Sequence, residues 1–412
     1  MAQRYQRALE YLYPRLTTIK FGLDTTRRLL AALGNPHDVF ATVHIGGTNG
    51  KGSVATLVAD ALARHGFRVG LYTSPHLVSF RERIRVNGAP ITRDAVATWT
   101  EHLRPLADET SATFFEMTTA IALADFAARG AEIAVVEVGL GGRLDSTNVV
   151  TPLVSAVTHI ALDHMKYLGD SLEQIAREKA GIAKPGVPFV IGESDPALAA
   201  LLAEAARQAV ARQQRDATVE TRLVEPGRRW EGALGLAGPH QRRNAAVAEA
   251  VLDALPLRWR PSRESVAAAF EDARLPGRLD RRGRWLFDVA HNPDGVEALV
   301  AALRADPPAG PVHALVSILG DKEWPAMLVA LDQVVDRGIL TIAPSAEGRR
   351  WDLEWLSRWL ERPDRPPAHA EWTLVPDFQQ ALAEASEGAG TVLVTGSFHT
   401  VGDVMAELRV ES

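Results

Sequence analysis

The segment HIGGTNGKGS, residues 44–53, combines closely spaced glycines with a lysine and a serine. Such glycines let backbone N–H groups turn toward an anion, and a helix beginning here would add positive potential. Lys51 would reach the terminal phosphates of a nucleotide, and the Ser53 hydroxyl would approach a magnesium ion directly or through water. The match to the general phosphate-loop pattern is imperfect, because Ile45 replaces its first glycine and Gly52 separates lysine from serine. We interpret the segment as a phosphate-binding loop; an ordinary Gly-rich turn is the alternative.

Carboxylates and a histidine stand where two further strands are expected to end. Glu137 closes the apolar run in VVEVGLGGRLDSTN, residues 135–148, and Asp163 and His164 follow the next run in THIALDHMKYLGD. Ligands of parallel sheets bind at the carboxyl ends of the strands, where such side chains are well placed to hold Mg²⁺. For each of these residues taken alone, the alternative is a structural role, in which the polar side chain is hydrogen-bonded within the fold and binds no ligand.

Lys179 lies on the apolar side of an expected helix over residues 171–186, SLEQIAREKAGIAKPG. At about 100° per residue it shares a face with Leu172, Ile175, Ala176 and Ala183. Lysine is rarely buried without a partner, because loss of water lowers its pKa. Either its stem packs while the ammonium reaches solvent, or the amine is poised for covalent chemistry.

A second group of polar residues occurs in the C-terminal third. In RWLFDVAHNPDG, residues 284–295, Asp288 and His291 follow an expected strand, and Asn292 and Pro293 suit the start of a helix. TVLVTGSFHTVGD, residues 391–403, repeats the arrangement with Ser397 and His399. The start of a helix is enough to explain Asn292, as its N-cap, and Pro293, in its first turn. It does not explain Asp288 and His291.

These residues need a parallel-sheet scaffold, and the alternation of short β-branched runs with helical patterns predicts one. Nine strands are expected, over 41–46, 68–73, 132–138, 153–158, 187–191, 284–289, 312–319, 338–343 and 391–396. A helical stretch over 239–272 and the connector ARLPGRLDRRG separate the two sets. We therefore expect an α/β protein in which an N-terminal phosphate-loop ATPase domain, residues 1–275, precedes a smaller Rossmann-like domain, residues 276–412.

The composition excludes several other classes of protein. With 412 residues, 46% of them hydrophobic and 23% charged, the chain is typical of globular proteins and not of disordered, collagenous or coiled-coil ones. A net charge of -6 without a basic cluster argues against a nucleic-acid partner. The lack of cysteine excludes disulfides and thiolate chemistry. No membrane-length apolar run or secretory signal is found, so we expect a cytoplasmic protein without a membrane partner.

Taken in order, several motifs resemble those of folylpolyglutamate synthases, members of the Mur ligase superfamily of which some are also dihydrofolate synthases. The resemblance covers residues 20–405 and rests on GGTNGKGS, TSPHL, FFEMT, EVGLGGRLDSTN, LDHMKYLGD, EKAGIAK, HQRRNA, LPGR, DVAHNP, LGDKE and TGSFHTVG. It implies ATP-dependent addition of L-glutamate to a folate carboxylate through an acyl phosphate, with ATP and two Mg²⁺ ions as cofactors. We expect the protein to be a monomer.

The resemblance also implies roles for individual residues. ATP contacts would come from Asn49, Gly50, Lys51, Gly52, Ser53, Asn244, Arg278 and Asp288, so that the nucleotide would span the domain junction. Ser74, Glu137, His164 and Lys179 would hold the metal ions, with Lys179 carbamylated. His291 and Ser397 match positions near the incoming glutamate. The pterin-bearing substrate would contact Gly22, Leu23, Asp24, Phe115, Glu116, Arg143, Leu144 and Asp145, although Phe115 also suits a helical core.

Three alternatives compete with this assignment. A peptidoglycan-type Mur ligase usually carries a nucleotide-sugar domain of about one hundred residues before the phosphate loop, and fewer than fifty residues precede it here. A GTPase would normally carry an Asn-Lys-x-Asp motif, which we do not find. A non-catalytic nucleotide-binding paralogue would be favoured by loss of Lys51, Glu137, His164 or Lys179, and all four are present.

Overall fold

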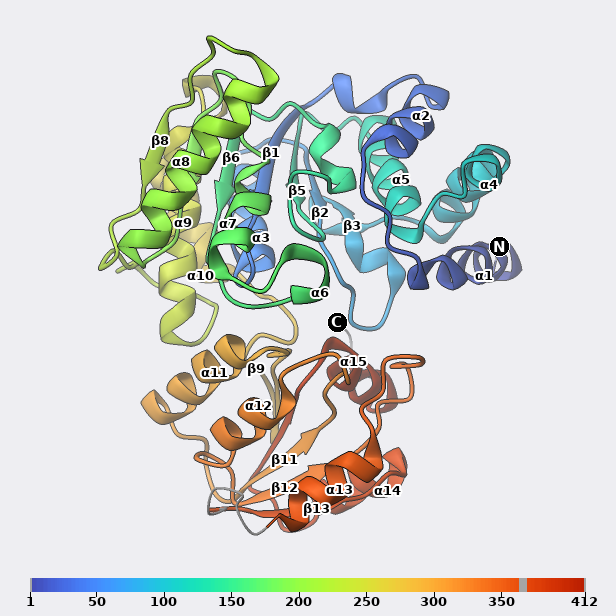
Figure 1. Cartoon of the computed structure of the whole chain (residues 1–412), viewed down its shortest axis with the longest axis vertical. Helices are drawn as coiled ribbons and strands as arrows, with labels where there is room; N and C mark the ends of the chain where they lie inside the picture. The colour runs from blue at the N-terminus through green and yellow to red at the C-terminus, as the bar shows by residue number, and fades with distance from the viewer. Residues whose placement is uncertain (1, 363–368, 411–412) are drawn as a thin grey trace. The chain divides into compact units, whose positions relative to one another are not determined.

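The computed structural model describes residues 2–362 and 369–410 and divides the chain into two compact units (Figure 1). The first unit comprises Met1–Pro75, Arg81–Leu234 and Arg242–Ala273. The second comprises His76–Phe80, Gly235–Gln241 and Arg274–Ser412. Two short segments that precede residue 275 in the chain therefore pack with the second unit. Each unit is described by itself.

The first unit is built on an eight-stranded sheet with the order β4-β3-β2-β5-β1-β6-β7-β8. All neighbours from β2 to β8 run parallel, and β3 and β4 add an antiparallel edge. The central strands are buried on both faces, which is why they read as continuous apolar runs. The strands are β1 Ala41–Gly46, β2 Val69–Tyr72, β3 Ile84–Val86, β4 Ala89–Pro90, β5 Ile133–Glu137, β6 Val154–Val157, β7 Phe189–Ile191 and β8 Thr221–Leu223.

Helices cover this sheet through apolar faces. α7 (Leu172–Ala180) and α8 (Pro196–Gln213) pack on β6 and β7, where Ile175 and Leu202 meet Phe189. In Figure 1 α2, α4 and α5 gather on the side of β2 and β3. The remaining helices are α1 Ala2–Leu12, α2 Asp24–Ala32, α3 Lys51–Arg64, α4 Arg93–Thr110, α5 Phe114–Ala128, α6 Met165–Leu168, α9 Pro239–Ala254 and α10 Arg263–Asp272, with short 3₁₀ turns at Tyr13–Thr17, Pro36–Asp38, Phe80–Arg83, Ser146–Val149 and Leu257–Trp259.

The second unit contains a six-stranded sheet with the order β13-β12-β11-β14-β10-β9, in which only β9 runs antiparallel to its neighbour. Successive side chains of β11 point to opposite faces, so that Ala314 and Val316 join one core cluster and Leu315 joins another. The strands are β9 Asp280–Arg282, β10 Trp285–Phe287, β11 Val312–Val316, β12 Arg337–Leu340, β13 Glu371–Leu374 and β14 Thr391–Thr395.

Helices lie on both faces of the second sheet. α11 (Pro293–Ala305), α12 (Trp324–Leu331) and α13 (Leu353–Glu361) supply Val296, Met327 and Leu356 to one core cluster. α14 (Phe378–Ser386) and α15 (Phe398–Glu407) supply Ala381 and Val404 to the other. Side chains from both faces thus bury the β11–β14 centre, as in a doubly wound fold.

All nine expected strands are present, and the differences from the sequence-based expectation have local causes. Five short strands were missed (β3, β4, β8, β9 and β13), because two to four residues carry little periodicity. The expected connector after Ala273 contains β9, which pairs with β10. The helix expected to reach residue 186 ends at Ala180, because glycine, here Gly181 at the C-cap, favours the helix poorly and Pro185 follows shortly after. No described helix has the length and apolar character needed to cross a bilayer.

Candidate functional site

The phosphate-loop segment connects β1 to α3 and depends on two glycines with positive φ. Gly47 has φ +140°, and a Cβ there would lie 2.0 Å from Thr158 Oγ1. Gly50 has φ +85°, and a Cβ there would lie 2.5 Å from Asn244 Oδ1. A side chain at either position would meet both backbone strain and a collision. The loop therefore brings Asn244 against Gly50, two residues that the sequence assigned to one nucleotide site.

The loop after β6 supports the phosphate loop through hydrogen bonds. Thr158 Oγ1 donates to the Asn49 carbonyl at 2.6 Å. Thr48 donates its backbone N–H to the His159 carbonyl at 2.6 Å, and its hydroxyl accepts from Ala161 N at 3.1 Å. Sequence reasoning missed Thr48 and Thr158, although Thr158 stands at a strand end, where the rule that found Glu137 also applies.

Two lysines point at this loop. Lys51 Nζ donates to the Thr48 carbonyl at 3.0 Å, and Lys179 Nζ donates to the Gly47 carbonyl at 2.9 Å. Lys179 is only 5% exposed. Burial lowers the pKa of Lys179, and the charge of Lys51 lowers it by a smaller amount. The carboxylates of Asp163 and Asp145 raise it, and the net result is a pKa of about 7. An amine with this pKa is substantially uncharged near neutral pH and can act as a nucleophile.

Glu137 lies beside the start of α3. Its Oε2 accepts the backbone N–H of Ser74 at 3.1 Å and would lie 3.6 Å from a Cβ on Gly52. The structure thus brings Glu137, Ser74 and the phosphate loop together. His164 has φ +52° and donates its backbone N–H to Asp163 Oδ1 at 2.7 Å.

This set of donors suits a hard cation. Within residues 2–362 and 369–410, no three His, Cys, Asp or Glu side chains gather as a metal site. Mg²⁺ does not require such a group, because it keeps several waters and is usually held by one or two carboxylates together with substrate phosphates. A carboxylate and a hydroxyl beside a phosphate loop fit that pattern.

Two of the expected acceptor segments are adjacent. Gly22 N donates to the Leu144 carbonyl at 3.4 Å, which places Gly22–Asp24 beside Arg143–Asp145. Leu23 caps α2 and Asp24 is exposed. Arg143 forms a half-exposed ion pair with Glu178 at 2.9 Å. Asp145 is buried and accepts from Leu140 N and Thr147 N, while burial raises the pKa of its carboxyl group.

Phe115 and Glu116, the third acceptor segment, begin α5 and have structural roles. The ring of Phe115 covers Gly139, where an added Cβ would lie 2.2 Å from the ring. Glu116 is 2% exposed and forms a capping box with Thr113, accepting from its backbone N–H at 2.8 Å. The ring lies against the Gly-rich loop that carries Arg143, whereas the Glu116 carboxylate is engaged by the helix terminus.

Two candidates of the second unit lie beside Phe398. The Phe398 ring lies 5.5 Å from the His291 ring and 5.0 Å from the Arg278 guanidinium. His291 Nδ1 lies 2.9 Å from the Val289 carbonyl and so donates a proton to it. Phe398 was not identified as a site residue from the sequence.

The two buried polar candidates of the second unit hold backbone groups. Asp288 accepts from Leu279 N and Ala290 N, each at 2.9 Å, and burial raises the pKa of its carboxyl group. Ser397 is buried and caps α15 by accepting from Thr400 N at 3.1 Å. Both groups are thus held in fixed positions at strand ends.

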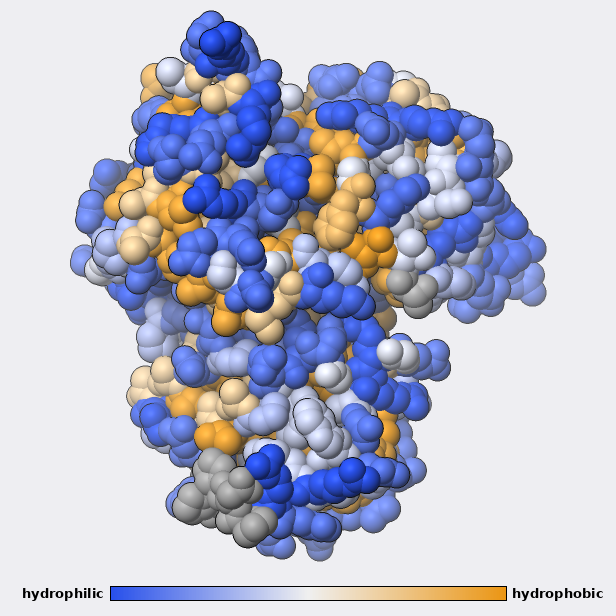
Figure 2. All heavy atoms as spheres, viewed as in Figure 1, coloured by the Kyte–Doolittle hydropathy of each residue, from blue (hydrophilic) through white to orange (hydrophobic). Residues whose placement is uncertain are grey.

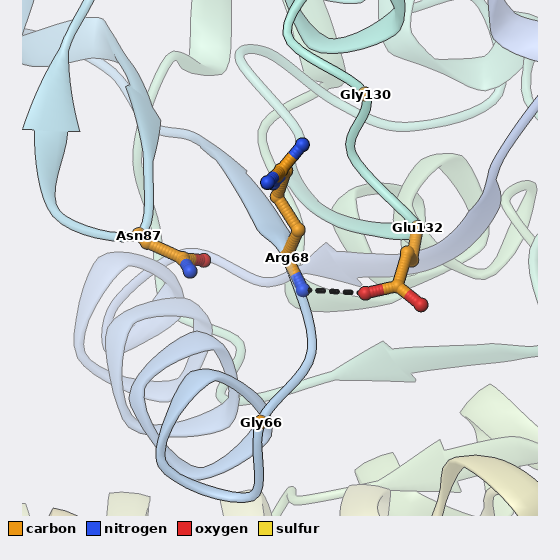
Figure 3. Close-up of a pocket in the computed structure, with 5 residues that line it drawn as sticks. All are labelled: Gly66, Arg68, Asn87, Gly130 and Glu132. Atoms are coloured by element: carbon orange, nitrogen blue, oxygen red, sulfur yellow. Dashed lines mark hydrogen bonds between the residues drawn. The ribbon is translucent and has the colours of Figure 1, made fainter.

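A separate cavity of about 390 Å³ lies at the amino ends of β2 and β5, away from these residues. Gly66, Arg68, Asn87, Gly130 and Glu132 line it, and Glu132 accepts the backbone N–H of Arg68 (Figure 3). The cavity contains none of the expected site residues, and its lining residues are exposed.

The face shown in Figure 2 is mixed, with hydrophobic patches among hydrophilic residues.

Comparison with known proteins identifies the family. The model of the Mur ligase middle domain matches residues 45–252, and that of the Mur ligase glutamate ligase domain matches residues 277–398. The dihydrofolate synthase/folylpolyglutamate synthase of Bacillus subtilis is 32% identical, over 99% of this chain and 100% of the relative. The chain belongs to the folylpolyglutamate synthase/dihydrofolate synthase family of Mur ligases.

Other relatives agree with this assignment. A Haloferax volcanii protein named "Probable bifunctional folylpolyglutamate synthase/dihydropteroate synthase" is 34% identical over 97% of this chain, which spans about half of that longer relative (50%). The structure of the Yersinia pestis bifunctional folylpolyglutamate synthase/dihydrofolate synthase, complexed with AMPPNP and Mn ion, has a TM-score of 0.82 at 30% identity and 98% coverage of both chains. The family and the two-domain α/β fold expected from the motifs are confirmed, and folate ligation is favoured over peptidoglycan ligation.

Proposed function

We propose that this protein is an ATP-dependent ligase that joins L-glutamate to the γ-carboxylate of tetrahydrofolate and releases ADP and phosphate. A carboxylate oxygen attacks the γ-phosphorus of ATP to form an acyl phosphate. The glutamate amine then attacks the acyl carbon, and phosphate leaves as the amide forms. Phosphorylation is needed because a carboxylate is a poor acyl donor.

The observation that carries this proposal is the convergence of Lys51, Lys179 and Glu137 on the phosphate loop. Backbone N–H groups of Asn49–Ser53 and the Lys51 ammonium would bind the ATP phosphates and stabilise the charge that develops during transfer. Asn244, which contacts Gly50, would hold the nucleotide from the side. Arg278 and Asp288 are proposed as further ATP contacts, and His291 and Ser397 as glutamate contacts.

Ser74, Glu137, His164 and Lys179 are proposed to hold Mg²⁺, in two sites. When bound, the metal would offset phosphate charge as a Lewis acid. The uncharged Lys179 amine would add CO₂, forming an N–C bond with loss of one proton and gaining a carboxylate. This modification converts a poor cation ligand into a good one.

The acceptor would lie along the adjacent segments Gly22–Asp24 and Arg143–Asp145 and along Phe115–Glu116, where the Phe115 ring lies against Gly139 of the same glycine-rich loop. Dihydropteroate is a smaller acceptor with the same pterin and benzoate groups, and we propose it as a second substrate. Residues 1–275 would then bind the pterin-bearing substrate and most of the ATP, and residues 276–412 would supply the glutamate contacts and the ATP contacts of Arg278 and Asp288. We further propose that the protein acts as a monomer in the cytoplasm.

Incubation of the purified protein with ATP, Mg²⁺ and L-[¹⁴C]glutamate tests the proposal directly. With tetrahydrofolate as acceptor, the label is expected in a folate product; with dihydropteroate, it is expected in dihydrofolate. A UDP-muramyl acceptor is the matched control and is expected to remain unlabelled. Label in that acceptor and none in either pterin would contradict the proposal. ADP binding without any product would favour the non-catalytic paralogue.

A further inference from the structure

His44 belongs to the phosphate-loop motif but has no role in the function proposed above. It lies on β1, two residues before Gly46, and its side chain is completely buried at 0% exposure. Its Nε2 lies 2.9 Å from Thr147 Oγ1, and its Nδ1 is a buried atom with no hydrogen-bond partner. A buried ring nitrogen without a hydrogen bond costs free energy of folding. This cost suggests that the hydrogen bond of the other ring nitrogen has a role.

The direction of each hydrogen bond follows from the partner of Thr147. The Thr147 hydroxyl donates its single proton to Asp145 Oδ1, the same oxygen that accepts from Thr147 N at 2.9 Å. The hydroxyl can then only accept from His44, so the ring must carry its proton on Nε2. Burial, with a smaller contribution from Lys184, lowers the pKa of His44 to about 3, so the ring is neutral. The chain His44 Nε2–H to Thr147 to Asp145 therefore has one orientation.

The chain of hydrogen bonds ends in the segment Arg143–Asp145. Asp145 also accepts from Leu140 N at 2.8 Å, which closes the glycine-rich loop after β5. From the other side, Asn148 Nδ2 donates to the Arg143 carbonyl at 2.9 Å and Lys184 Nζ donates to the Asn148 carbonyl at 2.9 Å. The segment is thus fixed at both ends by buried groups while the Arg143 side chain remains half exposed.

We infer that His44 is a positioning residue for the acceptor substrate: through Thr147 and Asp145 it ties the acceptor segment to the strand that carries the phosphate loop. The inference rests on the proposed function, because it assigns Arg143–Asp145 to the acceptor. Loss of the link lets the segment move relative to the phosphate loop, so that the acceptor binds more weakly and its carboxylate is presented less often to the γ-phosphate. Nucleotide binding, proposed to use the loop backbone, Lys51 and Asn244, is not expected to change.

Two matched pairs of variants test the link. Thr147→Val removes the hydroxyl at nearly constant shape, whereas Thr147→Ser keeps it. His44→Gln places an amide N–H close to the position of Nε2, whereas His44→Asn places it close to Nδ1 and out of reach. We expect Thr147→Val and His44→Asn to raise the KM for the pterin acceptor at least about tenfold, with Thr147→Ser and His44→Gln within about threefold of wild type. The KM for ATP and ADP binding by calorimetry are expected to change by less than about twofold.

An unchanged acceptor KM in Thr147→Val, or an equal rise in the KM for ATP, overturns the inference. If these variants do not fold, ¹⁵N NMR of the wild-type histidine rings decides the link without them. His44, assigned from correlations of its ring to the wild-type backbone, is expected as the Nε2–H tautomer at pH 7, and the Nδ1–H tautomer overturns the inference. Failure of the proposed function is distinguishable, because a wild-type protein that labels no pterin acceptor leaves the tautomer result standing.

Discussion

The phosphate loop and the acceptor segments of the first unit present their functional groups in different ways. In the loop, the groups proposed to bind phosphate are backbone N–H groups next to glycines at φ +85° and +140°, and two lysines donate to the carbonyls of the loop. In the acceptor segments, the named polar side chains are engaged by the fold: Glu116 caps a helix and Arg143 pairs with Glu178. The phosphate site is therefore specified by a local motif, whereas the acceptor site is specified by how separate segments are held together.

This difference predicts that substitutions in the two sites act differently. A change in the phosphate loop is expected to remove a contact to the proposed nucleotide directly. A change in an acceptor segment is expected to alter the stability of the protein as well, so binding and folding must be measured separately.

Lys51→Ala is expected to give the largest loss of activity. Removing the ammonium that we propose contacts the ATP phosphates should lower kcat/KM for ATP by about 10²–10³-fold. Lys20→Ala is the control, since Lys20 donates at the surface to the Thr25 hydroxyl at 3.3 Å and to the Thr110 carbonyl at 2.9 Å, and its loss should change kcat/KM by less than about twofold. If steady-state assays show both variants equally active, the assignment of the phosphate loop is wrong.

Gly50→Ala is expected to weaken ADP binding by about a hundredfold, because the new Cβ collides with Asn244 Oδ1 at a positive φ. Gly186→Ala separates the two causes. Gly186 has φ +70° but no atom within 4 Å of a new Cβ, so it carries the backbone strain without the collision. Calorimetry is expected to show nearly unchanged ADP affinity for that control. Equal losses in both variants would mean that the strained backbone weakens binding through the stability of the fold, and not through the collision with Asn244.

Lys179→Met is expected to change how stability depends on pH. The pKa of Lys179 is lowered to about 7 in the folded state from an ordinary value of 10.5, so between these pH values only the unfolded state binds the proton. The free energy of unfolding of wild type therefore rises with pH across this window. We compare the free energy of unfolding of the variant with that of wild type in CO₂-free buffer. The advantage of the variant should be about 2 kcal/mol larger at pH 6 than at pH 9. If denaturant titrations give the same difference in the free energy of unfolding between variant and wild type at both pH values, Lys179 is not a buried amine.

Glu116→Ala is expected to produce the smallest effect, a loss of about 1 kcal/mol in the free energy of unfolding, because the capping box is removed. Glu116→Gln retains an acceptor for Thr113 N and should lose less. If Glu116 acts only as a cap, neither variant changes the KM for the pterin acceptor once folded protein is assayed. A raised acceptor KM in Glu116→Gln at unchanged stability would place the carboxylate against the substrate.

The sequence predicted nine of the strands, and the polar residues at their ends, because both depend on local pattern. β1, β5 and β6 are almost wholly buried and mostly apolar, with few polar residues among the apolar ones, and glycines lie in or next to the loops after β1 and β5. The pairing of Gly22 with Leu144 and the link from His44 to Asp145 could not be predicted, because these contacts join segments about 100 residues apart. Glu116 shows the converse problem, since its Thr-x-x-Glu spacing also fits a capping box.

Transfer of ¹⁸O tests the central claim, an acyl phosphate formed on the acceptor carboxylate, most directly. Dihydropteroate labelled with ¹⁸O in its carboxylate is incubated with ATP, Mg²⁺, L-glutamate and the purified protein, and the released phosphate is examined by ³¹P NMR. One ¹⁸O atom is expected in the phosphate for each dihydrofolate formed. Product formation with unlabelled phosphate would contradict the account.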